Sequence, residues 1–194
     1  MKILGVLGSP RSGGNSDILL DEALRGARDD GAEVEKIVLD RLQIHGCRDC
    51  KSCNETGRCV QEDDMQLVLE KILQSQGIIH SCPIYFYSMT AQMKAYLDRW
   101  CALYDEKWKF HSHYLPRMRG KNMAVIVVCG DSDIKMAELA IVPFQRLVQA
   151  ETNILKWGGS LAVPSVDVKG EVQQNKKALE KAYQLGWQMV ETSK

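Results

Sequence analysis

The feature that most constrains the fold of this chain is an alternation of short β-rich runs with longer amphipathic stretches along almost its whole length. Such alternation is expected for parallel strands that are joined by crossover helices. Several of the runs are almost continuously apolar, as strands buried on both faces require. Five strands are predicted, at Lys2–Leu7, Glu33–Val38, Gly77–Ser81, Asn122–Val128 and Ile154–Val163.

The amphipathic stretches predict helices at Ser16–Asp30, Asp64–Gln74, Thr90–Trp100, Ile134–Glu151 and Glu171–Glu191. Pro143 is expected to kink or split the fourth, because proline removes a backbone donor. Together the elements predict an α/β fold with a doubly wound, five-stranded parallel sheet in the order 2-1-3-4-5. We expect residues 1–194 to form one domain, with two irregular segments: a cysteine loop at 40–63 and a long connection at 102–120.

Net charge and the lengths of the apolar runs limit the classes of partner and the cellular location that we expect. Twenty-five basic residues balance twenty-five acidic ones, so bulk electrostatics favours neither nucleic acid nor an anionic membrane. The first apolar run is too short for a signal peptide, and no apolar stretch approaches the ~20 residues that span a bilayer. Seven cysteines, unevenly distributed, suit thiols that are reduced or metal-bound. We therefore expect a cytoplasmic protein.

The segment Gly8–Ser16, which we call the phosphate loop, follows the first predicted strand and opens the first predicted helix. Its glycines allow close backbone approach, and hydroxyl and helix N-terminal N–H groups can donate to phosphate oxygens. It lacks the lysine of a triphosphate-binding loop, so a monophosphate such as that of FMN fits better. The alternative is an ordinary strand-to-helix turn. The candidate binding residues are Ser9, Arg11, Gly14, Asn15 and Ser16.

A second candidate region follows the third predicted strand. It is expected to form a loop at the carboxyl edge of the sheet, with apolar and aromatic side chains beside backbone donors, as a flavin ring requires. The alternative is that the aromatic side chains only cover the sheet edge. The candidate residues are Pro83, Ile84, Tyr85, Phe86 and Ser88.

These two motifs resemble the NADPH-dependent FMN reductase family, a group with a flavodoxin-like three-layer sandwich. The resemblance implies that the phosphate loop holds the FMN phosphate and that Pro83–Phe86 lies against the isoalloxazine. It also implies flavin contacts from the loop after the fourth strand, at Gly130 and Asp131. Negative charge from Asp131 would disfavour the anionic reduced flavin.

Four of the seven cysteines lie within thirteen residues, in the spacing C-x2-C-x2-C-x5-C. Thiolates at such spacing can converge on one iron–sulfur cluster, here predicted to be [4Fe-4S]. Structural zinc is the main alternative, and disulfides or idle thiols are a third. The predicted metal ligands are Cys47, Cys50, Cys53 and Cys59. No chemistry is assigned to Cys82, Cys101 or Cys129, which are expected to be small buried thiols.

With this motif the chain resembles the iron–sulfur flavoproteins, a branch of the same family. That resemblance implies an FMN-dependent oxidoreductase that needs no protein nucleophile. It would carry electrons between a one-electron donor such as ferredoxin and a small-molecule acceptor. It also implies a homodimer or homotetramer, with cluster and flavin near each other at subunit contacts. The alternatives are an NAD(P)H-dependent FMN or quinone reductase without a cluster, and a non-catalytic electron carrier or redox sensor. The aromatic and basic residues of the 102–120 connection are expected to form an oligomer contact rather than a substrate mouth.

Overall fold

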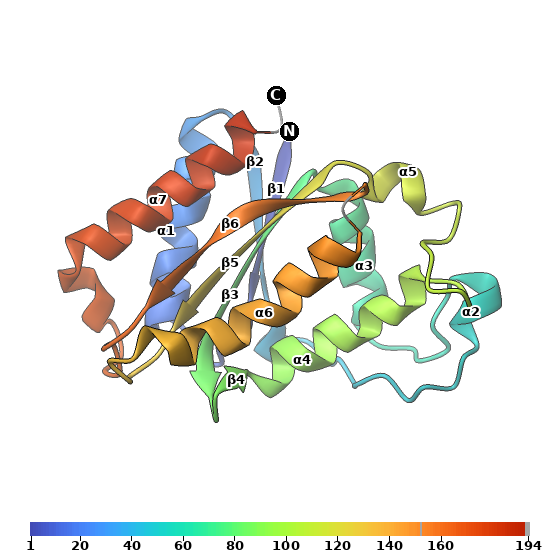
Figure 1. Cartoon of the computed structure of the whole chain (residues 1–194), viewed down its shortest axis with the longest axis horizontal. Helices are drawn as coiled ribbons and strands as arrows, with labels where there is room; N and C mark the ends of the chain where they lie inside the picture. Colours follow the sequence, from blue (N-terminus) through green and yellow to red (C-terminus); the bar gives the residue numbers. More distant parts are fainter. Residues whose placement is uncertain (152, 193–194) are drawn as a thin grey trace.

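The computed structural model describes residues 1–151 and 153–192, and its centre is a parallel sheet with helices on both faces (Figure 1). The sheet order is β2-β1-β3-β5-β6, and each neighbouring pair is parallel. Counted along the chain, this is the 2-1-3-4-5 order of flavodoxin-like proteins, so the predicted fold is confirmed. The strands are β1 (Lys2–Leu7), β2 (Glu33–Val38), β3 (Gly77–Tyr85), β5 (Lys121–Val128) and β6 (Leu155–Val163).

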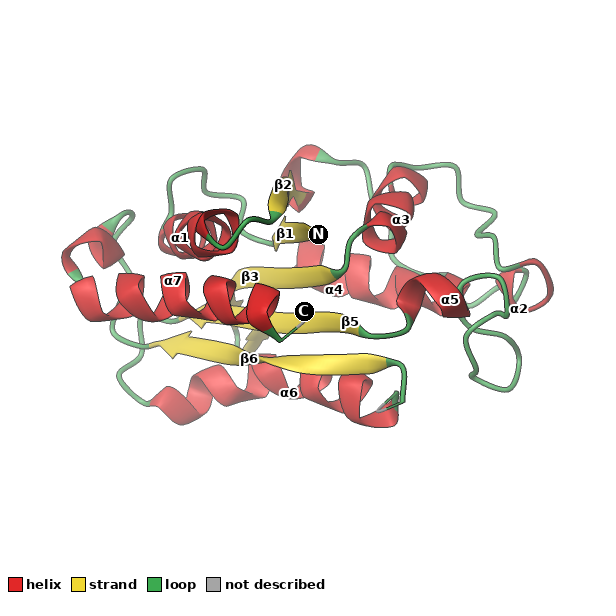
Figure 2. Cartoon of the chain, turned by 90° about the horizontal axis from the view of Figure 1, so that it is seen from above, coloured by secondary structure: helices red, strands yellow, loops and turns green. Residues whose placement is uncertain are grey.

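Two helical layers cover the sheet (Figure 2). Helices α1 (Asn15–Asp29) and α7 (Lys176–Glu191) pack on one face. Helices α3 (Met65–Gln74), α4 (Ala91–Asp98) and α6 (Ile134–Ala150) pack on the other. Because both faces are covered, every residue of β5 is buried.

Most predicted helices agree with the structure to within a few residues, and two differ. Helix α6 runs through Pro143 without a break. The predicted Glu171–Glu191 helix is divided into a 3-10 turn, η3 (Glu171–Gln174), and α7. The division occurs because Asn175 leaves the helical conformation and its side chain accepts from the Ala178 N–H, at 3.0 Å.

The region after Ser81 is a strand rather than the predicted loop. Its backbone continues β3 to Tyr85 because the pairing with β5 extends to Pro83 opposite Val128. Beyond that point the short antiparallel strand β4 (Ser88–Met89) becomes the partner of β3. Phe86 and Tyr87 form the turn of this hairpin, with φ of 47° and 65°. The predicted aromatic loop is thus a projecting hairpin.

The two irregular segments contain short helices that the sequence did not predict. They are η1 (Leu39–Arg41) and α2 (Cys53–Thr56) in the first segment and α5 (Leu115–Met118) in the second. The predicted Thr90–Trp100 helix continues beyond α4 as the 3-10 turn η2 (Arg99–Leu103). Across the described chain, no helix combines the length and apolarity needed to cross a bilayer.

His80 lies in the middle of β3 and is fully buried. Its Nε2 is 3.2 Å from the Tyr96 hydroxyl, and its ring packs 4.8 Å from that of Phe144. Burial lowers the pKa of His80 to about 3, since the charged imidazolium has no water around it.

We predict that His80 makes the fold sensitive to acid. Its folded-state pKa is depressed, so protons bind the unfolded chain in preference, and stability is lost as pH falls below about 6.5. Between about pH 7.5 and pH 5 this loss should be about 2 kcal/mol. Urea unfolding of wild type and His80→Leu at both pH values measures it. Equal pH dependence in the two proteins would contradict the prediction.

Candidate functional site

A cavity of about 90 Å³, which we call the edge cavity, lies where the carboxyl ends of β1, β3 and β5 meet. It brings together most of the residues predicted to bind the flavin. The phosphate loop contributes Ser9, Arg11, Gly14, Asn15 and Ser16. The end of β3 contributes Pro83, Ile84 and Tyr85, and the loop after β5 contributes Gly130.

Three of the predicted residues lie outside this cavity. Phe86 is at the tip of the hairpin and 98% exposed, and Ser88 follows it in β4. Asp131 folds back into its own loop, where its carboxylate accepts the Asp133 N–H at 2.8 Å. The acidic group that does line the cavity is Asp167, which the sequence analysis did not identify.

The phosphate loop is fixed between β3 and α4. The Gly8 N–H donates to the Ser81 carbonyl at 2.8 Å, and the Thr90 hydroxyl donates to the Gly8 carbonyl at 2.7 Å. Thr90 also caps α4 by accepting the Met93 N–H. A Cβ at Gly8 would lie 2.9 Å from that of Met93, so the loop can approach α4 this closely only with glycine.

Asn15 connects the start of α1 to a segment more than 150 residues away. Its Nδ2 donates to the Val168 carbonyl at 3.0 Å, and its Oδ1 accepts the Val172 N–H at 3.1 Å. The Asn15 side chain therefore holds the 166–169 segment against the phosphate loop, with both its amide oxygen and its amide nitrogen in hydrogen bonds. This contact places Lys169 in the edge cavity, with its Cε 3.6 Å from where a Cβ on Gly13 would lie.

The charges around the phosphate loop favour an anion in the edge cavity. Arg11 and Lys169 both line it against one acidic residue, Asp167, and within the described residues neither cation forms an ion pair. Asp17, in the first turn of α1, accepts the Gly13 N–H at 2.7 Å and is neutralised by Lys36 at 2.8 Å. Two unpaired cations beside a helix N-terminus are a suitable site for a phosphate group.

A second cavity, of about 140 Å³, gathers the cysteines, and we call it the cysteine cavity. All four predicted ligands line it. Cys101, which was expected to have no chemistry, lines it as well and is only half-buried. It was missed because it lies 42 residues beyond Cys59 in sequence, outside the motif. Only the packing of η2 against the cysteine loop brings it there.

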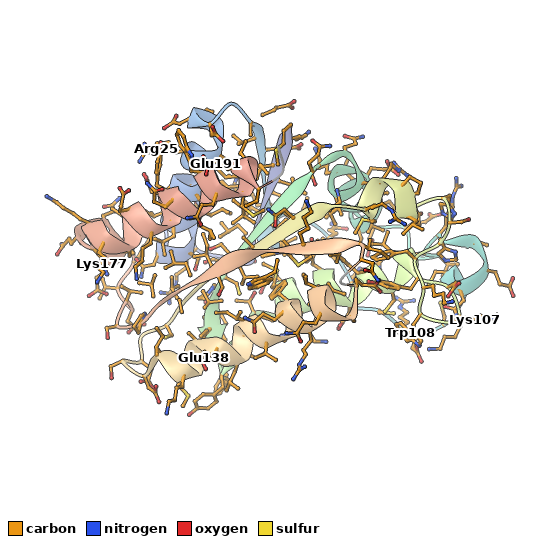
Figure 3. The ribbon with its side chains drawn as sticks, turned by 45° about the horizontal axis from the view of Figure 1, so that its top comes forward. Arg25, Lys107, Trp108, Glu138, Lys177 and Glu191 are labelled. Atoms are coloured by element: carbon orange, nitrogen blue, oxygen red, sulfur yellow. The ribbon has the colours of Figure 1, made fainter. Side chains whose placement is uncertain are left out.

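Residues of the long connection after α4 pack against the cysteine loop and hydrogen-bond to its backbone. Gly57 ends the single turn of α2 with φ of 70°, and a Cβ there would lie 2.7 Å from the His113 ring. The His111 Nε2–H donates to the Cys53 carbonyl at 2.9 Å, and the Tyr114 hydroxyl donates to the Gly57 carbonyl at 2.8 Å. Trp108, which also lines the cysteine cavity, projects from this end of the molecule and is 66% exposed (Figure 3).

A buried ion pair fixes both ends of the cysteine loop. Two nitrogens of the Arg99 guanidinium contact the Asp63 carboxylate at 2.5 and 3.0 Å, and the two side chains are 1% and 3% exposed. Arg99 also donates to the His45 carbonyl at 2.9 Å. Burial opposes ionisation of Asp63, yet Arg99 and backbone N–H groups hold its pKa below the usual range. One guanidinium thus joins the residues before and after the four cysteines.

The donor set of the cysteine cavity fits a metal centre chemically. All its ligand candidates are thiols, the donors that iron–sulfur clusters and structural zinc use. Burial, and then negative charge on Cys59, Cys47 and Cys50, raises the pKa of Cys53, because thiolates gathered at one cavity repel each other. A cationic centre would relieve this repulsion. In the described part of the chain, no three His, Cys, Asp or Glu side chains are placed so that they could hold a single metal ion.

Comparison with known proteins identifies the family. The family model for NADPH-dependent FMN reductase matches residues 1–166. The chain belongs to this family. The resemblance inferred from the phosphate loop and the Pro83 region is thereby confirmed.

Among the curated proteins that are similar to this chain, several are named iron-sulfur flavoprotein. One, from Archaeoglobus fulgidus, is 41% identical over 99 residues, which cover 51% of this chain and 45% of that protein. A Bacillus subtilis protein with the name "Putative NAD(P)H-dependent FMN-containing oxidoreductase YwqN" is 34% identical over 133 residues, 68% of each chain. The matched segment spans about half the length of the first curated relatives, at 45%, 51% and 52%.

A solved structure supports the same fold over nearly the whole chain. The Trp repressor binding protein from Bacillus subtilis superposes with a TM-score of 0.69 at 27% identity. The match covers 94% of this chain and 98% of that one.

We predict that Asp63→Asn strongly destabilises the protein. It leaves the Arg99 charge buried without its partner, which should cost about 3–5 kcal/mol in the free energy of unfolding. Asp98→Asn is the matched control, since it removes the exposed Lys94–Asp98 pair and should cost less than about 1 kcal/mol. Urea unfolding followed by circular dichroism measures both. Similar losses in the two variants would show that the buried pair has no special role.

Proposed function

We propose that this chain is an FMN-dependent oxidoreductase that binds FMN in the edge cavity. The observation that carries the proposal is the meeting of two motifs, far apart in sequence, around that one cavity. Membership in a family of FMN reductases supports it. FMN supplies electron and hydride chemistry when bound, and the protein contributes binding, orientation and electrostatics.

The residues of the edge cavity divide into two parts that suit the two ends of FMN. Arg11, Lys169 and the first N–H groups of α1 form the cationic part, which would hold the phosphate. Pro83–Tyr85, at the end of β3, forms the apolar part, which would lie against the ring. Asp167 would lie near the ligand and disfavour additional negative charge there.

We further propose that Cys47, Cys50, Cys53 and Cys59 bind a [4Fe-4S] cluster. Their thiols line one cavity, and relatives over the matched segment are named iron-sulfur flavoprotein. The role of such a protein would be to pass electrons between a one-electron donor such as ferredoxin and FMN, which then reduces a small-molecule acceptor.

The separation of the two cavities supports a homodimer or homotetramer. The edge cavity and the cysteine cavity share no lining residue, and α4 lies between the hairpin and η2 (Figure 1). Eight residues of helix span about 12 Å. In an oligomer, the cysteine cavity of a second copy could lie nearer to the flavin than the cysteine cavity of the chain that binds this flavin. Exposed aromatic side chains at both places, such as Phe86 and Trp108, are suited to such a contact.

A second candidate function is NAD(P)H-dependent reduction of flavin or quinone without a cluster. The Bacillus subtilis relative favours it, because its name specifies NAD(P)H and FMN. Steady-state oxidation of NAD(P)H by iron-free protein would support this function. Reduction by ferredoxin alone would support the cluster-dependent one.

We predict that Lys169 contributes to FMN binding although it lies far from the phosphate loop in sequence. Arg11→Ala and Lys169→Ala should each weaken FMN binding about tenfold, through loss of a charge-assisted bond to phosphate. Lys177→Ala is the control, because Lys177 is exposed at the start of α7 and should leave the affinity unchanged (Figure 3). Quenching of flavin fluorescence measures the Kd. The Kd for riboflavin, which lacks the phosphate, should differ little from the wild-type value in all three variants.

We predict about four iron and four sulfide ions per chain after anaerobic purification, together with one FMN. Cys53→Ala should lose the iron and keep the FMN, because the two cavities are separate. Cys82→Ala should keep both, since that thiol lies in the core. Elemental analysis and visible absorption measure the contents. One zinc per chain without sulfide would overturn the cluster assignment.

A further inference from the structure

A third cavity, of about 350 Å³, lies between η2 and helix α6, and we call it the aromatic cavity. It shares no lining residue with the edge cavity, and it contains none of the four cysteines of the motif. Its walls are largely apolar and come from Trp100, Tyr104 and Trp108 on η2 and the turn after it, and from Pro143 and Leu147 on α6. A volume and lining of this kind are typical of sites for small organic molecules.

Trp108 is exposed, yet its backbone is held in a closed turn. The Asp105 carboxylate accepts the Lys107 N–H at 2.8 Å and the Lys109 N–H at 3.0 Å. The Trp108 N–H donates to the Asp105 carbonyl at 3.0 Å, and its φ of 56° turns the chain back on itself. The Trp108 ring lies 6.3 Å from that of Tyr104 and is tilted by 50° to it. The two rings are therefore offered to the cavity from a fixed turn, and Trp108 projects from the molecular surface (Figure 3).

Glu151 gives this apolar cavity a negative charge. Among the described residues that line the cavity, Glu151 alone is charged, and it forms no ion pair with any described residue. It caps the C-terminus of α6, the negative end of the helix dipole, and the last turn of that helix, described throughout, has no basic side chain. Burial raises the pKa of Glu151, as expected for a carboxylate without a compensating cation.

Tyr104 lies next to this carboxylate. Its hydroxyl is buried and has no hydrogen-bond partner among the described groups. Burial and then the negative charge of Glu151 raise the pKa of Tyr104. A cation between the aromatic rings and Glu151 would therefore supply the positive charge that the described residues do not.

We propose that the aromatic cavity binds a small organic cation with an apolar body, such as a quaternary ammonium compound. The faces of Trp and Tyr rings attract such cations, and the Glu151 carboxylate adds the opposite charge. A neutral apolar molecule would leave Glu151 without a counter-charge, and an anion would be repelled by it. A small inorganic cation would gain little from apolar walls, because it would have to give up its hydration. The site is independent of both the proposed FMN and the proposed cluster.

The experiment measures binding of benzyltrimethylammonium to the purified full chain by isothermal titration calorimetry. The comparison ligand is 2,2-dimethyl-3-phenylpropan-1-ol, which has nearly the same shape but no charge. Wild type should bind the cation at least about tenfold more tightly than the alcohol, because only the cation interacts with both the rings and the carboxylate. This comparison needs no variant, so it does not depend on how well any substitution folds.

Three variants then assign the binding to the named residues. Glu151→Gln should weaken cation binding about tenfold and leave alcohol binding unchanged. Trp108→Leu should weaken cation binding about fivefold, whereas Trp108→Phe, which keeps an aromatic ring, should lose less. Glu138→Gln is the matched control, since it removes an exposed carboxylate from the same helix outside the cavity and should have no effect (Figure 3).

Circular dichroism and bound FMN should be the same in all these proteins, because the edge cavity lies apart from the substituted residues. Three results would each overturn the proposal. They are no binding of the cation to wild type, equal affinities for the cation and the alcohol, and equal losses in Glu151→Gln and Glu138→Gln. The second would identify the cavity as an apolar groove without charge selectivity.

Discussion

The arrangement of the cysteine loop depends on the buried ion pair between Arg99 and Asp63. Between Gln43 and Asp63 the loop has little regular structure, and its only helix is a single turn. Arg99 joins the Asp63 carboxylate to the His45 carbonyl, so one side chain closes the loop at both ends. A buried pair of this kind costs desolvation, and its main effect is to define geometry, because removing either partner leaves an unpaired charge. The cysteines can share a cavity because their flanks are fixed in this way.

The sheet sets the position of the other cavity by a different principle. In a parallel sheet the strand ends and the helix beginnings meet at one edge, and the N-terminus of α1 lies where the strand order reverses. Hydrogen bonds to β3 and α4 hold the phosphate loop there, and the Asn15 side chain adds the 166–169 segment. Strand ends therefore position most of the edge cavity, whereas the cysteine cavity depends on contacts between irregular segments.

These two kinds of support have consequences for function. The edge cavity lies at strand ends whose backbone is paired in the sheet. The cysteine cavity, in contrast, is assembled from two segments, and its thiols come from both. Helix α4 connects the regions mechanically, since Thr90 at its start bonds to the phosphate loop and Arg99 at its end bonds to the cysteine loop.

The sequence by itself predicted the five parallel strands and the two local motifs, because these depend on periodicity and on residues close together in the chain, and the pairing order followed from the fold class that this alternation indicates. It predicted the limits of β1 and β2 correctly. It did not predict that Pro83–Tyr85 would extend β3. That extension depends on pairing of Pro83 with β5 and of Ile84 and Tyr85 with β4. Tertiary structure alone decided that Lys169 joins the edge cavity through Asn15 and that Cys101 joins the cysteine cavity through η2. Such contacts arise from packing between segments separated by tens of residues, and no local pattern encodes them.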